Sequence, residues 1–76
     1  MSREISKKER DFNSRLGGWL KQLRLNRQLS QAEMCETLGI HRNTLARYEA
    51  GAVMPLYMFL RINKKIGVAA QEVLKW

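Results

Sequence analysis

The stretch Leu29–Gly51, LSQAEMCETLGIHRNTLARYEAG, decides the fold, because it predicts two short helices joined by a tight turn. Ser30 and Glu33 have the spacing of a capping box, in which each side chain accepts a hydrogen bond from the backbone N–H of the other residue. Gly39 stands where a helix can end in a left-handed residue at no steric cost. The capping box and the glycine together predict a helix that starts after residue 30 and stops before residue 39.

The second helix of this stretch is expected from Arg42 to Glu49, with Gly51 ending it. At about 100° per residue, Leu45 and Tyr48 point to one side of this helix. The side chains expected on the opposite side are Arg42, Asn43, Ala46 and Arg47.

These four side chains suit the base edges of DNA in the major groove. Arginine makes paired hydrogen bonds to guanine, asparagine does the same with adenine, and an alanine methyl group can meet a thymine methyl group. A polar outer face is ordinary on a surface helix and indicates nothing by itself. The preceding helix and turn favour a DNA-reading helix, because this arrangement is the one that enters the major groove.

Residues 16–51 resemble the helix-turn-helix family of lambdoid phage repressors and Cro proteins, the XRE-type transcriptional regulators. The most specific matches are a Ser-Gln-x-Glu start at Ser30 and a Tyr-Glu-x-Gly finish at Gly51. The resemblance implies an all-α fold, a compact bundle of about five short helices that forms a lambda repressor-like DNA-binding domain over residues 12–76. The matching residues are Leu16-Gly17, Leu20, Leu23-Arg24, Leu29–Glu33, Leu38–Ile40 and Tyr48–Gly51.

The resemblance also implies roles for single residues. Gln31, at a helix N-terminus, is expected to hold a DNA phosphate, and Thr44 is expected to add a further phosphate contact. A partly buried ion pair is expected between Arg24 and Glu49, and Gly17 is expected to allow close packing. Bases are expected to be read by Arg42, Asn43 and Arg47, with Ala46 close to them.

Two positions depart from the pattern of the family. Cys35 stands where the family usually has alanine at a helix crossing, and a buried structural role is expected because cysteine behaves as a small hydrophobe. His41 stands where serine or threonine usually caps the second helix. Its ring can cap through a nitrogen or touch a phosphate, and the sequence does not decide between these two roles.

Helices are also expected on both sides of this stretch. One ends near Asn26, and another runs from Pro55 to Gly67, with Asn63 breaking its apolar stripe. Residues 68–76 are expected to form a last short helix. The polar, basic segment of residues 1–11 is interpreted as a solvated tail, as an arm along DNA, or as the start of the first helix, because residues 6–9 also match a capping box. The apolar stripe of the first helix comprises Phe12, Leu16, Trp19, Leu20 and Leu23.

Composition and charge narrow the classes of function that are expected for this chain. The 76 residues carry a net charge of +7, which favours a polyanionic partner. The single cysteine excludes a disulfide framework and fits the cytoplasm, where we expect the protein to be associated with the nucleoid. The sequence shows neither a membrane span nor a signal peptide. We expect no cofactor, metal or small-molecule ligand, and no enzymatic activity, since no nucleophile–base pair or metal cluster can be assembled from the spacing.

The favoured function is sequence-specific binding of double-stranded DNA by a Cro- or repressor-type regulator, as a homodimer on a palindromic operator. The alternative is an antitoxin-like protein whose main role is to bind a partner protein. Some apolar residues exceed what a small core needs, and they are the expected dimer contact: Tyr57, Met58, Leu74 and Trp76.

Overall fold

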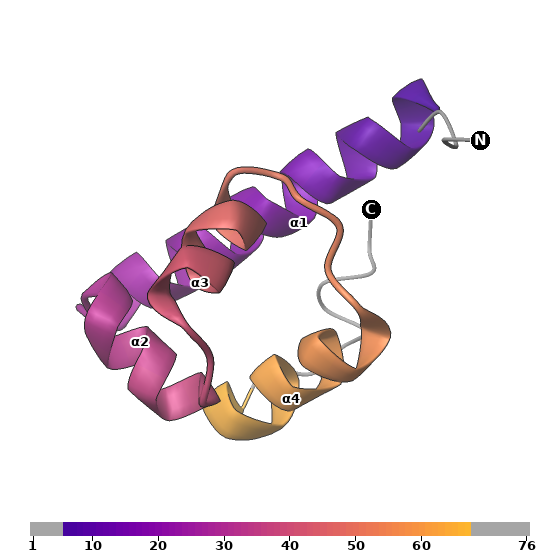
Figure 1. Ribbon diagram of the computed structural model, residues 1–76. Coiled ribbons are helices and arrows are strands. Elements are labelled where there is room, and N and C mark those ends of the chain that lie inside the picture. Colours follow the sequence, from indigo (N-terminus) through magenta and orange to yellow (C-terminus); the bar gives the residue numbers. More distant parts are fainter. Residues whose placement is uncertain (1–5, 68–76) are drawn as a thin grey trace.

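The computed structural model describes residues 6–67, and these residues form four helices and no strand. The helices are α1 (Lys7–Asn26), α2 (Gln31–Leu38), α3 (Arg42–Glu49) and α4 (Leu56–Ile66). In Figure 1, α3 lies across α1, α2 lies beside both at one end, and α4 lies on the far side of a long connection. The expected all-α class is therefore confirmed for the described residues. The fifth helix expected over residues 68–76 lies outside them.

The first helix begins earlier than the apolar stripe alone indicated. The Ser6 hydroxyl accepts a hydrogen bond from the Glu9 N–H at 3.1 Å and caps the helix. Residues 7–11 are therefore helical, and residues 1–5 lie outside the described part of the chain. After Asn26 the chain turns at Gln28, whose φ of 57° lies in the left-handed region. A left-handed turn is usually predicted from a glycine, and none is present here, so this turn was not predictable from the local sequence.

The predicted helix–turn–helix is present with the predicted boundaries. Glu33 N–H donates to the Ser30 hydroxyl at 3.1 Å, and Ser30 N–H donates to the Glu33 carboxylate at 2.9 Å, which completes the capping box. Gly39 ends α2 with a φ of 68°, and its N–H donates to the Cys35 carbonyl at 2.8 Å. Short-range signals were sufficient here because each of these bonds spans one turn of helix.

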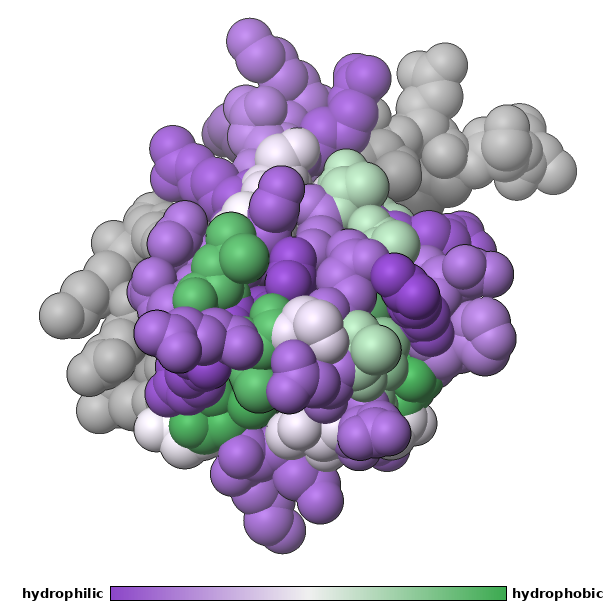
Figure 2. All heavy atoms as spheres, turned by 90° about the vertical axis from the view of Figure 1, so that its left-hand side faces the viewer, coloured by the Kyte–Doolittle hydropathy of each residue, from purple (hydrophilic) through white to green (hydrophobic). Residues whose placement is uncertain are grey.

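A single main core joins the four helices. Each of the four helices contributes at least one fully buried side chain to this core, so each packs against the others. Trp19 is partly buried beside this core and packs against Phe59, with ring centroids 5.7 Å apart, as its place in the apolar stripe predicted. On the side of the molecule where α2 lies, most of the surface side chains are hydrophilic (Figure 2). The largest fully buried side chains are Leu20, Met34, Leu38, Leu45 and Ile62.

Two expectations about apolar residues are corrected by the packing. Met58 is buried in the main core, so it is not available for the expected contact with a second copy. Phe12 was expected on the core-facing stripe of α1, but its side chain is 45% exposed.

Asn63 is buried on α4, and its amide donates to the Phe59 carbonyl one turn earlier at 2.6 Å. Its place in the apolar stripe is thus compatible with the helix.

Gly17 is required by the close approach of α1 to the end of α3. A Cβ atom at this position would overlap the Tyr48 carbonyl oxygen and lie 3.0 Å from the Glu49 carbonyl oxygen. Both obstacles are backbone atoms, which cannot rotate away. The neighbouring Gly18 faces open space, with nothing within 4 Å of the corresponding position.

The two glycines form a matched pair for mutagenesis. Gly17→Ala is expected to lower the free energy of unfolding by about 1–3 kcal/mol, because α1 and α3 must move apart. Gly18→Ala is expected to raise it by about 0.5–1 kcal/mol, because it stiffens an exposed helix position without a clash. Urea unfolding of both variants measures the two effects, and equal effects would contradict the close approach at Gly17.

The capping box predicts that the free energy of unfolding depends on pH. Hydrogen bonds from the backbone and hydroxyl of Ser30 hold the pKa of Glu33 below its ordinary value of 4.5. A lowered pKa means that the cap stabilises the fold above pH 4.5 and that this contribution is lost as the pH falls through the folded-state pKa. Glu33→Gln keeps a capping side chain that does not titrate. In urea unfolding at decreasing pH, the unsubstituted protein should lose more stability than Glu33→Gln, and parallel declines would exclude this role.

Candidate nucleic-acid interface

Helix α3 divides into a buried side and an exposed side. Leu45 and Tyr48 are buried in the core. Burial raises the pKa of Tyr48, so its hydroxyl stays protonated. The residues expected to read bases, namely Arg42, Asn43, Ala46 and Arg47, are all exposed. The guanidinium, amide and methyl groups are thus presented together on one helix, away from the core.

His41 caps α3 through its ring. Its Nδ1 accepts a hydrogen bond from the Asn43 N–H at 3.2 Å. Of the two roles left open by the sequence, capping is therefore present in the structure. An imidazole that accepts at Nδ1 carries its proton on Nε2 when neutral, so the exposed ring keeps one donor. A phosphate contact from that donor remains a prediction.

The ion pair expected between Arg24 and Glu49 is present and nearly sealed from solvent. Arg24 Nε donates to Glu49 Oε2 at 2.8 Å, and Nη2 donates to Oε1 at 3.2 Å. The two side chains are only 9% and 6% exposed. The hydrogen bond to Glu49 raises the pKa of Arg24. The third Arg24 donor, Nη1, bonds the Leu29 carbonyl at 2.9 Å, so one side chain fixes α1, the start of α2 and the end of α3.

Gln31 is tied into the same network, which the sequence did not indicate. Its Nε2 donates to Glu49 Oε1 at 3.2 Å from the first residue of α2. An amide NH2 group has two hydrogens, so this bond orients the side chain while leaving a second N–H. The phosphate contact expected of Gln31 is untested, but its amide is held in place beside α3.

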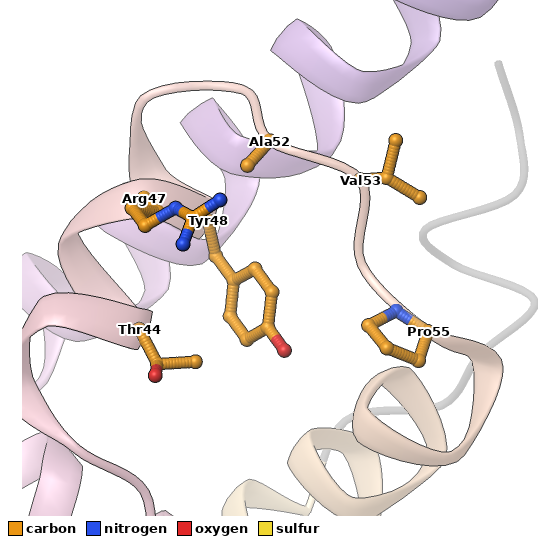
Figure 3. A pocket seen from close by; sticks show the side chains of 6 residues that line it. All are labelled: Thr44, Arg47, Tyr48, Ala52, Val53 and Pro55. Atoms are coloured by element: carbon orange, nitrogen blue, oxygen red, sulfur yellow. The ribbon is translucent and has the colours of Figure 1, made fainter. Parts of the chain in front are cut away.

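A shallow cleft of about 210 Å³ lies between α3 and the connection to α4 (Figure 3). Thr44, Arg47 and Tyr48 supply its α3 wall, and the ring of Tyr48 extends toward Pro55. All three side chains contain hydrogen-bond donors, and the residues lining the cleft include no acid. The cleft therefore extends the donor-rich exposed side of α3 toward the connection, whose lining residues are Ala52, Val53 and Pro55.

The described residues place no metal-binding cluster and no exposed thiol at this surface. Cys35 is buried, and its burial raises the pKa of the thiol, which keeps it protonated and supports the expected structural role. Within residues 6–67, no group of three or more His, Cys, Asp or Glu side chains is placed to hold a metal ion. No helix in that range is long and apolar enough to cross a membrane.

Of the residues expected at a dimer contact, the structure describes Tyr57 and Met58. Tyr57 is exposed on α4, where the guanidinium carbon of Arg61 lies 5.8 Å from the centre of its ring. Met58 is buried, as described above, while Leu74 and Trp76 lie outside the described residues.

Comparison with known families identifies the architecture. The family model for a helix-turn-helix domain matches residues 15–73, which includes the whole of α2, α3 and α4. The first turns of α1 precede the matched range. Comparison with curated proteins gives no significant match.

The Arg24–Glu49 pair can be tested by a double-mutant cycle. Arg24→Met and Glu49→Leu should each lower the free energy of unfolding by about 3–5 kcal/mol, because each leaves an uncompensated buried charge. The double variant should lose far less than the sum of the two, since neither charge is then present. Urea unfolding gives all three values, and additive losses would show that the two side chains do not depend on each other.

Proposed function

The chain belongs to a helix-turn-helix domain family, and on that premise we propose that it is a regulator of transcription that binds a specific sequence of double-stranded DNA. The observation that carries this proposal is the exposed side of α3, where Arg42, Asn43 and Arg47 stand together. A helix presented in this way can enter the major groove with its side chains directed at the base edges.

Each exposed residue of α3 has a base that suits its chemistry. Arg42 and Arg47 can each form two parallel hydrogen bonds with guanine, and Asn43 can do so with adenine. Ala46 lies on the same exposed side, where its small side chain lets the helix axis come close to the bases and its methyl group can meet that of thymine. The short and long side chains together define a preferred sequence rather than general affinity for DNA.

Phosphate contacts are proposed for the residues around this helix. Gln31 stands at the N-terminus of α2 and His41 caps the N-terminus of α3, where backbone N–H groups and the helix dipole favour anions. Thr44 lines the cleft shared with Arg47 and brings a hydroxyl donor. Such contacts fix the register of the protein on the duplex without reading its sequence.

We further propose a repressor of the Cro type, which binds a palindromic operator as two copies. In that arrangement the recognition helices of the two copies lie about 34–36 Å apart, one turn of DNA. The supporting observation is the resemblance to the regulator family over residues 16–51, together with the match to the helix-turn-helix family. DNA itself can bring the two copies together at adjacent half-sites, even where the free protein is monomeric.

The base-reading role is tested with Arg47→Ala after selecting bound oligonucleotides from a random pool. The variant should lose about 1–3 kcal/mol of binding free energy on the selected sequence, with relaxed preference at one position. Its affinity for random DNA should change much less. Fluorescence anisotropy measures both, and the matched control is Lys65→Ala, an exposed cation on α4.

Two outcomes would contradict the proposal. If Arg47→Ala weakens selected and random DNA equally, the guanidinium binds phosphate and reads no base. If the unsubstituted protein prefers its selected site by much less than about 10³-fold, its binding is not sequence-specific in the usual sense. A salt titration accompanies both measurements, since the affinity should fall with a slope of about −0.9 per phosphate neutralised.

A further inference from the structure

Helix α4 has an apolar surface on its outer side as well as on its core side. Leu56, Tyr57 and Leu60 are 70%, 62% and 52% exposed. Single exposed apolar side chains are ordinary, but Leu60 lies four residues after Leu56 and three after Tyr57, so that it neighbours both on the helix surface. We call Leu56, Tyr57 and Leu60 the outer face of α4. A contiguous exposed apolar face of this kind is a candidate surface for a protein contact.

An apolar cleft adjoins the outer face. It encloses about 220 Å³ between α1 and the start of α4, and Leu56 belongs both to the cleft and to the outer face. The space is sufficient for one large apolar side chain from outside, which is the usual anchor of a protein–protein contact. The cleft is lined by Phe12, Leu16, Met54, Leu56 and Phe59.

Positive charge flanks this apolar surface. Helix α4 carries Arg61, Lys64 and Lys65, and the sequence contains no acidic residue between positions 50 and 67. At the other end, Lys8 and Arg15 lie with Asp11 in a hollow that also includes Phe12, a lining residue of the cleft. The surface is therefore apolar in the middle and basic on two sides.

We infer that the outer face of α4 and its cleft bind an acidic amphipathic helix of a second protein. The apolar side of such a helix would cover Leu56, Tyr57 and Leu60, with one large side chain in the cleft. Its carboxylates would meet the cations of α4, chiefly Lys64. Helices that bind in this way use apolar anchors about three, four and seven residues apart, which matches the length of α4.

The charge argues against a second copy of this chain as the occupant. A two-fold contact through α4 would set the same surface against itself, so that Arg61 and Lys64 of the two copies approached each other. Like charges brought together across an interface are unfavourable, and α4 has no acid to offset them. This inference therefore replaces the contact between copies expected at Tyr57.

The test uses two synthetic amphipathic helical peptides that share a leucine face. One carries glutamate on its polar face, and the other carries lysine at the same positions. The full chain should bind the glutamate peptide, with an affinity that falls as salt is added, and should not bind the lysine peptide. Leu60→Ser and Lys64→Glu should each weaken the glutamate peptide about tenfold, as expected at the centre and the charged edge of a small interface.

Leu25→Ser is the matched control, because Leu25 is 48% exposed on α1, outside this surface, and its substitution should leave peptide binding unchanged. Thermal unfolding followed by circular dichroism checks that each variant is folded. Affinity for the selected DNA should be unchanged in Leu60→Ser, which separates this inference from the proposed function.

Three results would overturn the inference. The first is a failed peptide test, in which both peptides bind equally or the glutamate peptide binds Leu60→Ser as well as the unsubstituted protein. The second is a dimer in sedimentation velocity without DNA that Leu60→Ser dissociates, which would make a second copy the occupant. The third is binding to vesicles containing phosphatidylglycerol that depends on Leu60 while the glutamate peptide does not bind, which would assign the surface to a membrane.

Discussion

The ion pair between Arg24 and Glu49 joins parts of the chain that are distant in sequence and adjacent in the helix-turn-helix. Arg24 belongs to α1, Glu49 ends α3, and the same two side chains also hold the Leu29 carbonyl and the Gln31 amide. Since both charges are nearly buried, their desolvation is offset only if this geometry is kept. The start of α2 and the whole of α3 are thereby fixed relative to each other, as the proposed fit to DNA requires.

The close approach at Gly17 also fixes α3 relative to α1, through backbone packing instead of an ion pair. Gly17 and Arg24 are seven residues apart, on one side of α1, and both meet the last turn of α3. Without a side chain at Gly17, the backbone carbonyls of Tyr48 and Glu49 can lie directly against α1. Because α3 is held by its buried side along this line, Arg42, Asn43 and Arg47 on the opposite side stay exposed.

Two helices of this small chain thus present contrasting outer surfaces. The exposed side of α3 has long polar donors and one small apolar side chain, which suits polar base edges and phosphates. The outer face of α4 has large apolar side chains beside cations, and this combination suits a protein surface of opposite charge. The general positive charge of the chain assists either partner in approaching.

The sequence by itself determined the features that depend on one or two helical turns. These are the capping box at Ser30, the glycine that ends α2, and the side of α3 on which Arg42 and Arg47 lie. Tertiary structure alone decided which of two adjacent apolar residues is buried, since Met58 lies in the core while Tyr57 faces outward. It also decided that Gln31 bonds Glu49. The physical reason is that caps and helical periodicity act between near neighbours in the chain, whereas burial and long-range hydrogen bonds depend on which helices the fold brings together.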